Sequence, residues 1–215
     1  MQIKTLSLGP FQTNCYVLTH DSTTWVIDPG QDPEPLLAYL DADALTPERV
    51  LLTHGHADHI AGLAALVERF PGLPIAIHSA EATYPGDPAE NLSLGFGMPL
   101  VAPDPTELLE DGQTLDLAGL AVELLHTPGH SPGGVSFYFP SQGLAIVGDT
   151  LFAESIGRTD FPHSDHEALM RSIRERLLAL PGDTTILPGH GPGSTIGQER
   201  ATNPFVLEMM AGGET

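Results

Sequence analysis

The segment that most constrains the fold lies near residue 50, where an apolar run is followed at once by a cluster of histidines. The run is Val50-Leu51-Leu52, and the cluster is Thr53-His54-Gly55-His56-Ala57-Asp58-His59. Apolar residues then recur at helical spacing from Ile60 to Phe70, which predicts a helix directly after the cluster. A buried strand that leads into a helix delivers the residues between them to the carboxyl edge of a sheet, where α/β folds place their chemistry.

Four side chains of this cluster have the chemistry of metal ligands. We expect His54 and His56 to face a crevice from an extended segment, and Asp58 and His59 to face it from the first helical turn. Imidazole and carboxylate groups are common ligands of Zn²⁺, Mn²⁺ and Fe. Taken singly, Asp58 would serve as a helix N-cap, and a loop histidine would usually be solvated. The four residues together indicate a metal site.

Three later stretches repeat the same design, an apolar strand that ends in a metal-type residue beside glycine. They are Leu124-Leu125-His126-Thr127-Pro128-Gly129-His130, Ala145-Ile146-Val147-Gly148-Asp149-Thr150 and Ile186-Leu187-Pro188-Gly189-His190-Gly191. Glycine suits these positions because the backbone must turn sharply while a side chain faces the site. Each stretch alone would be an ordinary turn. Together they add His130, Asp149 and His190 to the first four donors, and seven nitrogen or oxygen ligands are enough for two metal ions.

Length and charge narrow the class of protein. We expect the 215 residues to form a single domain over residues 1–215. No apolar run approaches the roughly 18 residues of a membrane span, and no secretory leader is visible, so we expect a cytoplasmic protein without a membrane partner. The net charge of −20 disfavours nucleic acid as a partner, because binding to its phosphates needs clustered Lys and Arg. Cys15 is the only cysteine, which excludes an internal disulfide and a thiolate-rich zinc site and indicates a small core residue.

The order of apolar patterns predicts a mixed α and β fold. We expect strands at residues 3–8, 14–19, 24–28, 49–53, 74–78, 114–117, 120–125, 134–139, 144–147 and 184–187. We expect helices at residues 35–45, after Asp58 to about 70, at 165–180, and at 197–210 with an interruption at Pro204. Residues 80–105 are rich in Gly and Pro and predict an irregular covering segment. Two strand-rich halves that each carry helices favour two sheets packed face to face with helices outside.

The ligand string resembles a known family. His54-x-His56-x-Asp58-His59, followed in order by His130, Asp149 and His190, is similar to the metallo-β-lactamase fold superfamily over nearly the whole chain. The segments 127–133, 148–152, 157–162 and 199–204 resemble the short, one-domain branch of glyoxalase II-like (hydroxyacylglutathione hydrolase-like) enzymes. The resemblance implies a four-layer αββα sandwich of two mixed sheets, without a C-terminal substrate-binding domain.

The resemblance also implies a role for each donor. His54, His56 and His130 would bind one metal ion, Asp58, His59 and His190 a second, and Asp149 would bridge them. The cofactor would be two divalent ions per chain, with Zn, Fe or Mn all compatible with these ligands. Asp58 and Asp149, with a hydroxide between the ions, would form the catalytic centre. The implied reaction is hydrolysis of a glutathione thioester of the S-lactoylglutathione type, with hydroxide attacking the carbonyl of a small anionic substrate.

Two further residues are candidates for supporting roles. Asp28, at the end of a strand, would accept a hydrogen bond from a ligand histidine and orient it, although Asp28-Pro29-Gly30 is also an ordinary turn. Arg158 lies where the resemblance places a cation that contacts glutathione, and its alternative is a salt bridge to Asp160 or Asp165. His78 also follows an apolar strand but has no companion donors, so we interpret it as structural.

Departures from the family pattern keep other functions open. The chain has no C-terminal helical domain of the kind that grips glutathione, and Thr159-Asp160 stands where the longer enzymes carry a tyrosine. A mononuclear iron persulfide dioxygenase would use only His54, His130 and Asp149, and the intact Pro188-Gly189-His190-Gly191 disfavours it. A lactonase, a β-lactamase and a non-enzymatic metal-binding protein are further alternatives. The sequence makes no prediction of the oligomeric state.

Overall fold

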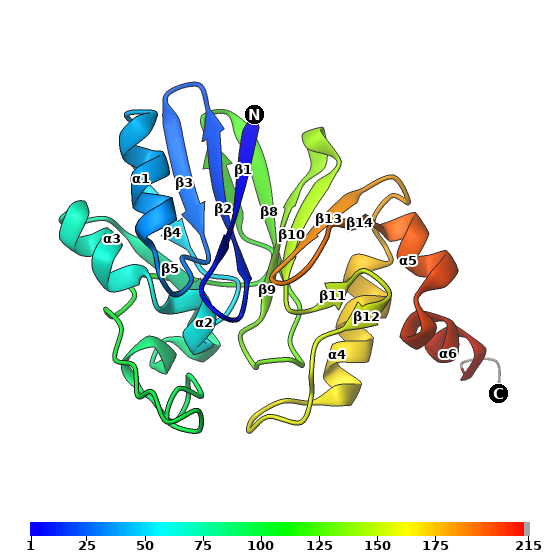
Figure 1. Cartoon of the computed structure of the whole chain (residues 1–215). Coiled ribbons are helices and arrows are strands. Elements are labelled where there is room, and N and C mark those ends of the chain that lie inside the picture. The colour runs from blue at the N-terminus through cyan, green and yellow to red at the C-terminus, as the bar shows by residue number, and fades with distance from the viewer. Residues whose placement is uncertain (213–215) are drawn as a thin grey trace. The chain divides into compact units, whose positions relative to one another are not determined.

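The computed structural model describes residues 1–212, which form two compact units (Figure 1). Unit 1 comprises Met1–Leu109 with Leu117–Gly119, and unit 2 comprises Glu110–Asp116 with residues 120–212. Each unit has its own six-stranded mixed sheet and its own helices. No helix within residues 1–212 is long and apolar enough to cross a membrane.

The sheet of unit 1 follows the order of the chain. Its strands are β1 (Gln2–Leu8), β2 (Thr13–His20), β3 (Thr23–Ile27), β4 (Arg49–Leu51), β5 (Ile75–His78) and β6 (Glu107–Leu109), in the order β1-β2-β3-β4-β5-β6. The first three strands are antiparallel, and β3 to β6 are parallel to one another. The parallel strands β3, β4 and β5 therefore present their carboxyl ends, and the loops that follow them, at one edge.

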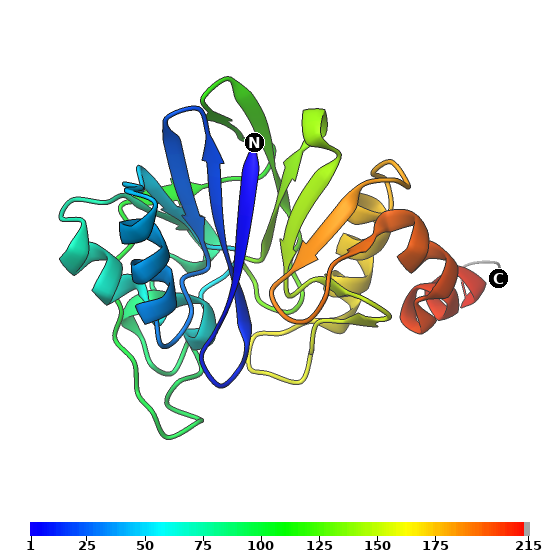
Figure 2. The ribbon, with the colours of Figure 1, turned by 45° about the horizontal axis from the view of Figure 1, so that its top comes forward.

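Helices cover one face of this sheet (Figures 1 and 2). They are α1 (Glu34–Ala42), α2 (Ala57–Ile60) and α3 (Leu63–Arg69), and the short 3₁₀ turns η1 (Ser79–Glu81) and η2 (Tyr84–Gly86) follow β5. Leu36 and Leu40 of α1 and Leu63 and Leu66 of α3 share a buried cluster with strand residues such as Val26. Burial of these apolar side chains is the main force that holds the helices to the sheet.

The helix predicted from Asp58 to Phe70 is broken into two. α2 begins after His56, so Asp58 lies in the first turn and is not the N-cap. The break falls at Gly62, whose N–H donates to the Pro29 carbonyl at 2.8 Å. A Cβ at Gly62 would lie 2.7 Å from the Gly30 carbonyl oxygen, so the close approach of the two backbones needs glycine there. A contact with residues that lie 32 and 33 positions earlier leaves no local signal in the sequence.

The second sheet is also mixed. Its strands are β7 (Thr114–Leu117), β8 (Leu120–His126), β9 (Val135–Phe139), β10 (Leu144–Gly148), β13 (Thr185–Pro188) and β14 (Ser194–Thr195), in the order β14-β13-β10-β9-β8-β7. β10 and β13 are parallel, while β8, β9 and β10 form an antiparallel meander. A two-stranded hairpin, β11 (Leu151–Phe152) with β12 (Ser155–Ile156), follows β10.

The helices of unit 2 come from the end of the chain. α4 (His166–Ser172) continues into a π-helical turn, η4 (Ile173–Leu177), and α5 (Ile196–Thr202) and α6 (Pro204–Gly212) follow; a 3₁₀ turn, η3 (Pro140–Gln142), joins β9 to β10. Asp165 caps α4 by accepting a hydrogen bond from the Ala168 N–H at 2.9 Å. Leu169, Ile173 and Leu177 share a buried cluster with Val147 of β10.

The predicted fold class is confirmed, since two mixed sheets with helices are the elements of the αββα sandwich. The predicted irregular segment at residues 80–105 contains only η1 and η2. Four strands of two or three residues, β6, β11, β12 and β14, were not predicted, because so short a strand has no apolar alternation.

Candidate metal centre

Unit 1 brings four of the predicted donors together. His54 and His56 lie in the loop after β4, and Asp58 and His59 lie in α2. The His54 ring centroid is 4.6 Å from that of His56 and 4.1 Å from that of His59. His59 Nε2 is 3.4 Å from Asp58 Oδ2. All three histidines are buried, so their rings are held in place by packing.

The Asp28 carboxylate contacts the ring of His59 at its Nδ1 nitrogen. Its Oδ2 lies 2.9 Å from His59 Nδ1, and both groups are buried. Asp28 also accepts hydrogen bonds from the Thr53 N–H at 2.8 Å and the Thr53 hydroxyl at 2.6 Å. A carboxylate at Nδ1 favours the tautomer that keeps the proton there and leaves the Nε2 lone pair for a metal. Asp28 follows β3 with φ 51°, and it makes the contact with a histidine that the sequence analysis proposed for it.

Glu81 was not predicted from the sequence, yet it fixes the loop that carries the first two histidines. Its Oε2 accepts a hydrogen bond at 2.5 Å from the N–H of Gly55, the residue between His54 and His56, and its side chain is fully buried. A Cβ at Gly55 would lie 2.5 Å from the Cβ of Tyr84, so the loop passes close to η2. The pKa of Tyr84 is raised, first by burial and then by the charges of Glu81 and Glu90.

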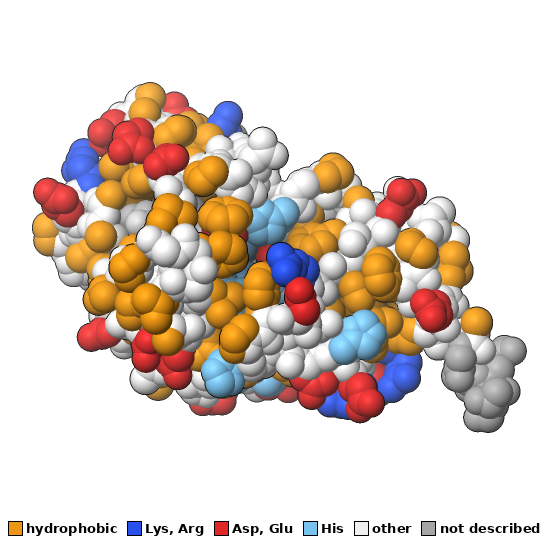
Figure 3. Space-filling model, turned by 60° about the horizontal axis from the view of Figure 1, so that its bottom comes forward, with side chains coloured by type: hydrophobic (Ala, Val, Ile, Leu, Met, Phe, Trp, Pro, Cys, Tyr) orange, Lys and Arg blue, Asp and Glu red, His pale blue; other side chains and the backbone are white. Residues whose placement is uncertain are grey.

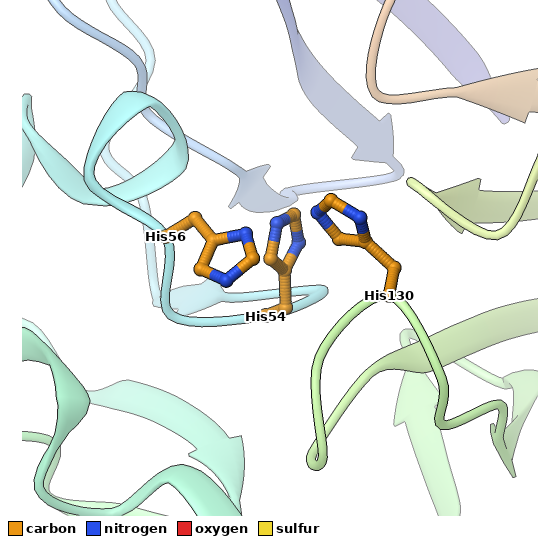
Figure 4. A group of neighbouring side chains, drawn as sticks. All are labelled: His54, His56 and His130. Carbon is orange, nitrogen blue, oxygen red and sulfur yellow. The ribbon is translucent and has the colours of Figure 1, made fainter. Parts of the chain in front are cut away.

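Unit 2 brings the other three predicted donors together. His130 follows β8, Asp149 follows β10 and His190 follows β13. Asp149 Oδ2 lies 3.6 Å from His130 Nε2 and 3.4 Å from His190 Nε2. The Arg158 carbonyl oxygen lies 2.9 Å from His130 Nδ1, which orients this ring as Asp28 orients His59. Figure 4 shows His130 on its loop, and His54 and His56 on theirs.

Glycines allow the close backbone packing around this second group. Gly129 precedes His130 with φ 137°, and a Cβ there would overlap the backbone of Leu169 in α4. A Cβ at Gly157 would overlap the carbonyl oxygen of Asp149. Glycine beside the ligands is therefore a steric requirement at these two positions.

Arg158 forms the ion pair with Asp160 that was the alternative to a substrate contact. Its Nε and one terminal nitrogen lie 2.9 Å and 2.8 Å from the two carboxylate oxygens, and the guanidinium lies 4.4 Å from the ring centre of Phe161. The hydrogen bond to Asp160 raises the pKa of Arg158, and the same bond lowers the pKa of Asp160. Both side chains are about two-thirds exposed, so an anion in solution can compete for the guanidinium.

His78 has a local structural role. Its Nδ1 accepts a hydrogen bond from the Ala80 N–H at 3.3 Å, which caps η1. Cys15 is buried in the core of unit 1. Burial raises the pKa of its thiol, and the charge of Asp28 raises it further. Neither residue is among the groups of donors that could hold a metal ion.

The donor chemistry fits a hard or borderline divalent metal ion. Each unit offers imidazole nitrogens and carboxylate oxygens, and in each unit one ring is oriented by a hydrogen-bond partner at its Nδ1. Zn²⁺, Fe and Mn²⁺ all accept such ligands.

Residues 8–190 match the sequence profile of the Metallo-beta-lactamase superfamily. The chain belongs to this superfamily. It is 37% identical over 210 residues to "Hydroxyacylglutathione hydrolase GloC" of Haemophilus influenzae, a match that covers 96% of this chain and 98% of that protein. The predicted resemblance is therefore confirmed at the level of the superfamily.

Two solved structures share the fold and much of the sequence. BLEG-1, a B3 metallo-beta-lactamase, superposes with a TM-score of 0.91 and 41% identity, covering 95% of this chain and 99% of that one. TTHA1623, in a di-iron-bound form, superposes with a TM-score of 0.86 and 41% identity, covering 94% and 99%. The chain is accordingly a metallo-hydrolase of this superfamily, with His and Asp side chains able to bind metal.

Proposed function

We propose that this protein is a hydrolase that uses two divalent metal ions per chain. His54, His56 and His130 would hold one ion, and Asp58, His59 and His190 the other, with Asp149 as the shared ligand. The donors grouped within unit 1 and within unit 2 support this assignment, as do the three groups of donors able to hold an ion. Similarity to a di-iron protein supports it further.

The residues of the chain would orient the ligands and leave a reactive centre for water. A pair of divalent ions supplies Lewis acidity that lowers the pKa of water to about 7 and polarises a carbonyl oxygen. Asp28 holds His59 and the Arg158 carbonyl holds His130, so both rings enter the reaction without reorganisation. Asp58 and Asp149 would contribute negative charge that retains the ions.

The substrate that we propose is a glutathione thioester of the S-lactoylglutathione type. The similarity to GloC over almost the full length of both proteins carries this step. A thiolate is a good leaving group, so the mechanism needs no strong general acid. Arg158 would release Asp160 and bind a carboxylate of glutathione in its place. A cytoplasmic location stays part of the same proposal.

The similarity to BLEG-1 favours β-lactam hydrolysis as the second candidate. A side-by-side assay of the metal-loaded protein distinguishes the candidates, with S-lactoylglutathione and a cephalosporin as substrates. Oxygen consumption with glutathione persulfide tests the dioxygenase alternative. Chelator should abolish the favoured activity, and metal should restore it. Faster turnover of the β-lactam, or oxygen uptake without thioester hydrolysis, would overturn the thioester proposal.

A further inference from the structure

A pocket of about 370 Å³ lies within unit 1 beside the proposed ligand Asp58. Its walls come from the β1–β2 loop, from α2 and from the segment after η2. The main lining residues are Phe11, Asp58, Ala61, Phe96, Met98 and Leu100. The volume lies within the range of about 300–1,000 Å³ that is typical of small-molecule sites.

Most of the residues that line this pocket are apolar, and Gln31, Asp58 and Ser93 are the polar ones. Phe11, Phe96, Met98 and Leu100 provide aromatic, thioether and aliphatic surface, and Asp58 is the one charged residue among those that line it. A glutathione moiety carries carboxylates, and burying them here without a cation would be unfavourable. The pocket therefore suits an uncharged, apolar part of a ligand.

Three of these apolar side chains are exposed at the surface. Phe11 is 43% exposed, Phe96 51% and Met98 52%. On the face drawn in Figure 3, hydrophobic side chains reach the surface in groups. Grouped apolar side chains at the surface of a soluble protein commonly mark a ligand or partner site.

The segment that carries Phe96 and Met98 is braced in a fixed shape. Asn91 is buried, its side-chain amide donates to the Leu100 carbonyl at 3.0 Å, and its own carbonyl accepts from the Ala57 N–H at 2.9 Å. The buried Ser93 hydroxyl accepts from the Leu100 N–H at 2.8 Å. The segment is thereby tied to α2, which carries Asp58.

Two aromatic rings that line the pocket contact each other. Phe11 and Phe96 meet edge to face, with ring centroids 5.7 Å apart and an angle of 66° between the planes. This edge-to-face arrangement is favourable for aromatic pairs and helps to fix the positions of the two rings. A preformed pocket loses little conformational entropy when a ligand binds.

We propose that this pocket binds the acyl chain of the substrate and selects apolar acyl groups longer than lactoyl. The inference rests on the proposed thioester hydrolysis, because it places the reacting carbonyl near Asp58. A thioester carbonyl has two substituents, and the carboxylate-bearing thiol needs a cation that this pocket lacks. The acyl substituent is therefore the one that fits, and a lactoyl group, with one methyl and one hydroxyl, would leave most of the pocket unfilled.

Binding and hydrolysis test this proposal separately. Binding is measured by calorimetry with ketones CH₃–S–CH₂–CO–R, in which a methylene between sulfur and carbonyl removes the scissile bond and R is methyl, propyl or pentyl. Each added methylene is expected to raise the affinity about three- to fourfold, or on the order of 100-fold from methyl to pentyl. Acetyl, butyryl and hexanoyl thioesters of one small neutral thiol should show a parallel rise in kcat/KM.

Two exposed residues of the same loop provide a variant and its control. Phe96→Ala removes one wall and should lower the affinity for the pentyl ketone about tenfold while leaving the methyl ketone unchanged. Leu94→Ala removes a side chain that is 58% exposed and does not line the pocket, so both affinities should stay the same. Unchanged circular dichroism and melting temperature show that both variants fold.

The possible results separate this inference from the proposed function. Affinity that does not rise with chain length, or equal effects of Phe96→Ala and Leu94→Ala, overturns the acyl pocket even if thioesters are hydrolysed. A rise in kcat/KM with apolar thiols in place of apolar acyl groups overturns it as well. Chain-dependent binding without hydrolysis of any thioester, S-lactoylglutathione included, overturns the proposed function and the acyl assignment with it.

Discussion

Glu81 shows how a single buried residue can control a ligand loop without being a ligand. Its carboxylate accepts the hydrogen bond of the Gly55 N–H, between two proposed ligands. We predict that Glu81→Ala lowers metal affinity roughly 10- to 100-fold, as is typical when an outer hydrogen-bond partner of a metal site is lost. The unsatisfied N–H should also destabilise the protein by about 1–3 kcal/mol.

Competition with a coloured chelator measures the metal affinity of these variants. Glu81→Gln keeps an acceptor oxygen and should restore most of the affinity. Glu90→Ala is the control, because Glu90 lies in the same segment and accepts a hydrogen bond from the Thr83 hydroxyl, not from the ligand loop. Wild-type affinity in Glu81→Ala would show that the loop needs no such support.

Arg158 and Asp160 give a prediction in which two substitutions act in opposite directions. The Arg158 guanidinium donates two hydrogen bonds to the Asp160 carboxylate, one to each oxygen. Arg158→Ala should raise KM for an anionic glutathione thioester by roughly 10-fold or more, because a charge-assisted contact is lost. Asp160→Asn should lower that KM, because it removes the competing anion. A neutral thioester is the control for steady-state kinetics, and equal effects on both substrates would remove Arg158 from the substrate site.

At the scale of elements, a buried polar network joins α5 to the β11–β12 hairpin and to β14. Glu199 accepts hydrogen bonds from the Glu154 N–H at 2.8 Å, from the Asn203 amide at 2.9 Å and from the Ser194 hydroxyl. Asn203 also donates to the Ser155 carbonyl at 2.9 Å. Since Glu199 and Asn203 are fully buried, each donor depends on the protein for its partner.

Loss of this carboxylate should destabilise unit 2. Glu199→Ala leaves buried donors unsatisfied and is expected to lower the free energy of unfolding by about 1–3 kcal/mol or more. Urea denaturation at fixed metal concentration measures the change through the midpoint. Glu208→Ala, at an exposed position of α6, should change the midpoint very little. A midpoint shift that is as large in the control would contradict a specific role of the network.

The sequence predicted those helices and strands whose positions are set by the local pattern of apolar residues and prolines. The strands from residue 3 to residue 28 and the interruption at Pro204 lie within two residues of their predicted positions, because apolar alternation and proline act locally. The break at Gly62 depends on the Pro29 carbonyl, and β14 is defined by its pairing with β13. Such contacts connect distant parts of the chain and leave no local pattern.

The proposed metal ligands have local sequence signals, whereas the residues that hold them in place make contacts between distant parts of the chain. Each proposed ligand follows an apolar strand, or begins the helix after one, beside glycine or other donors, so all seven could be proposed from the sequence. Glu81 supports its loop across 26 positions of sequence, and nothing in Ser79-Ala80-Glu81 marks it as more than a turn. The Asp160 partner of Arg158 was anticipated as an alternative, since it lies two residues away.

At the scale of the whole molecule, the charge of −20 attracts cations non-specifically, so a metal count is meaningful only with salt and a control. At about 0.15 M salt the screening length is about 8 Å, which weakens attraction to exposed carboxylates more than binding by buried imidazoles. Asp104→Ala removes an exposed carboxylate and provides the matched control for Asp149→Ala.

Under these conditions we predict two metal ions per chain after reconstitution and desalting. Asp149→Ala should lose one or both ions and nearly all hydrolytic activity, whereas Asp104→Ala should keep both. Ions that bind only the folded chain should stabilise it by RT ln(1 + [L]/Kd) and so raise its melting temperature, and chelator should lower it. Elemental analysis and thermal unfolding measure these effects. Full activity with a single ion per chain would contradict the two-metal hydrolase and favour the mononuclear alternative, which needs only His54, His130 and Asp149.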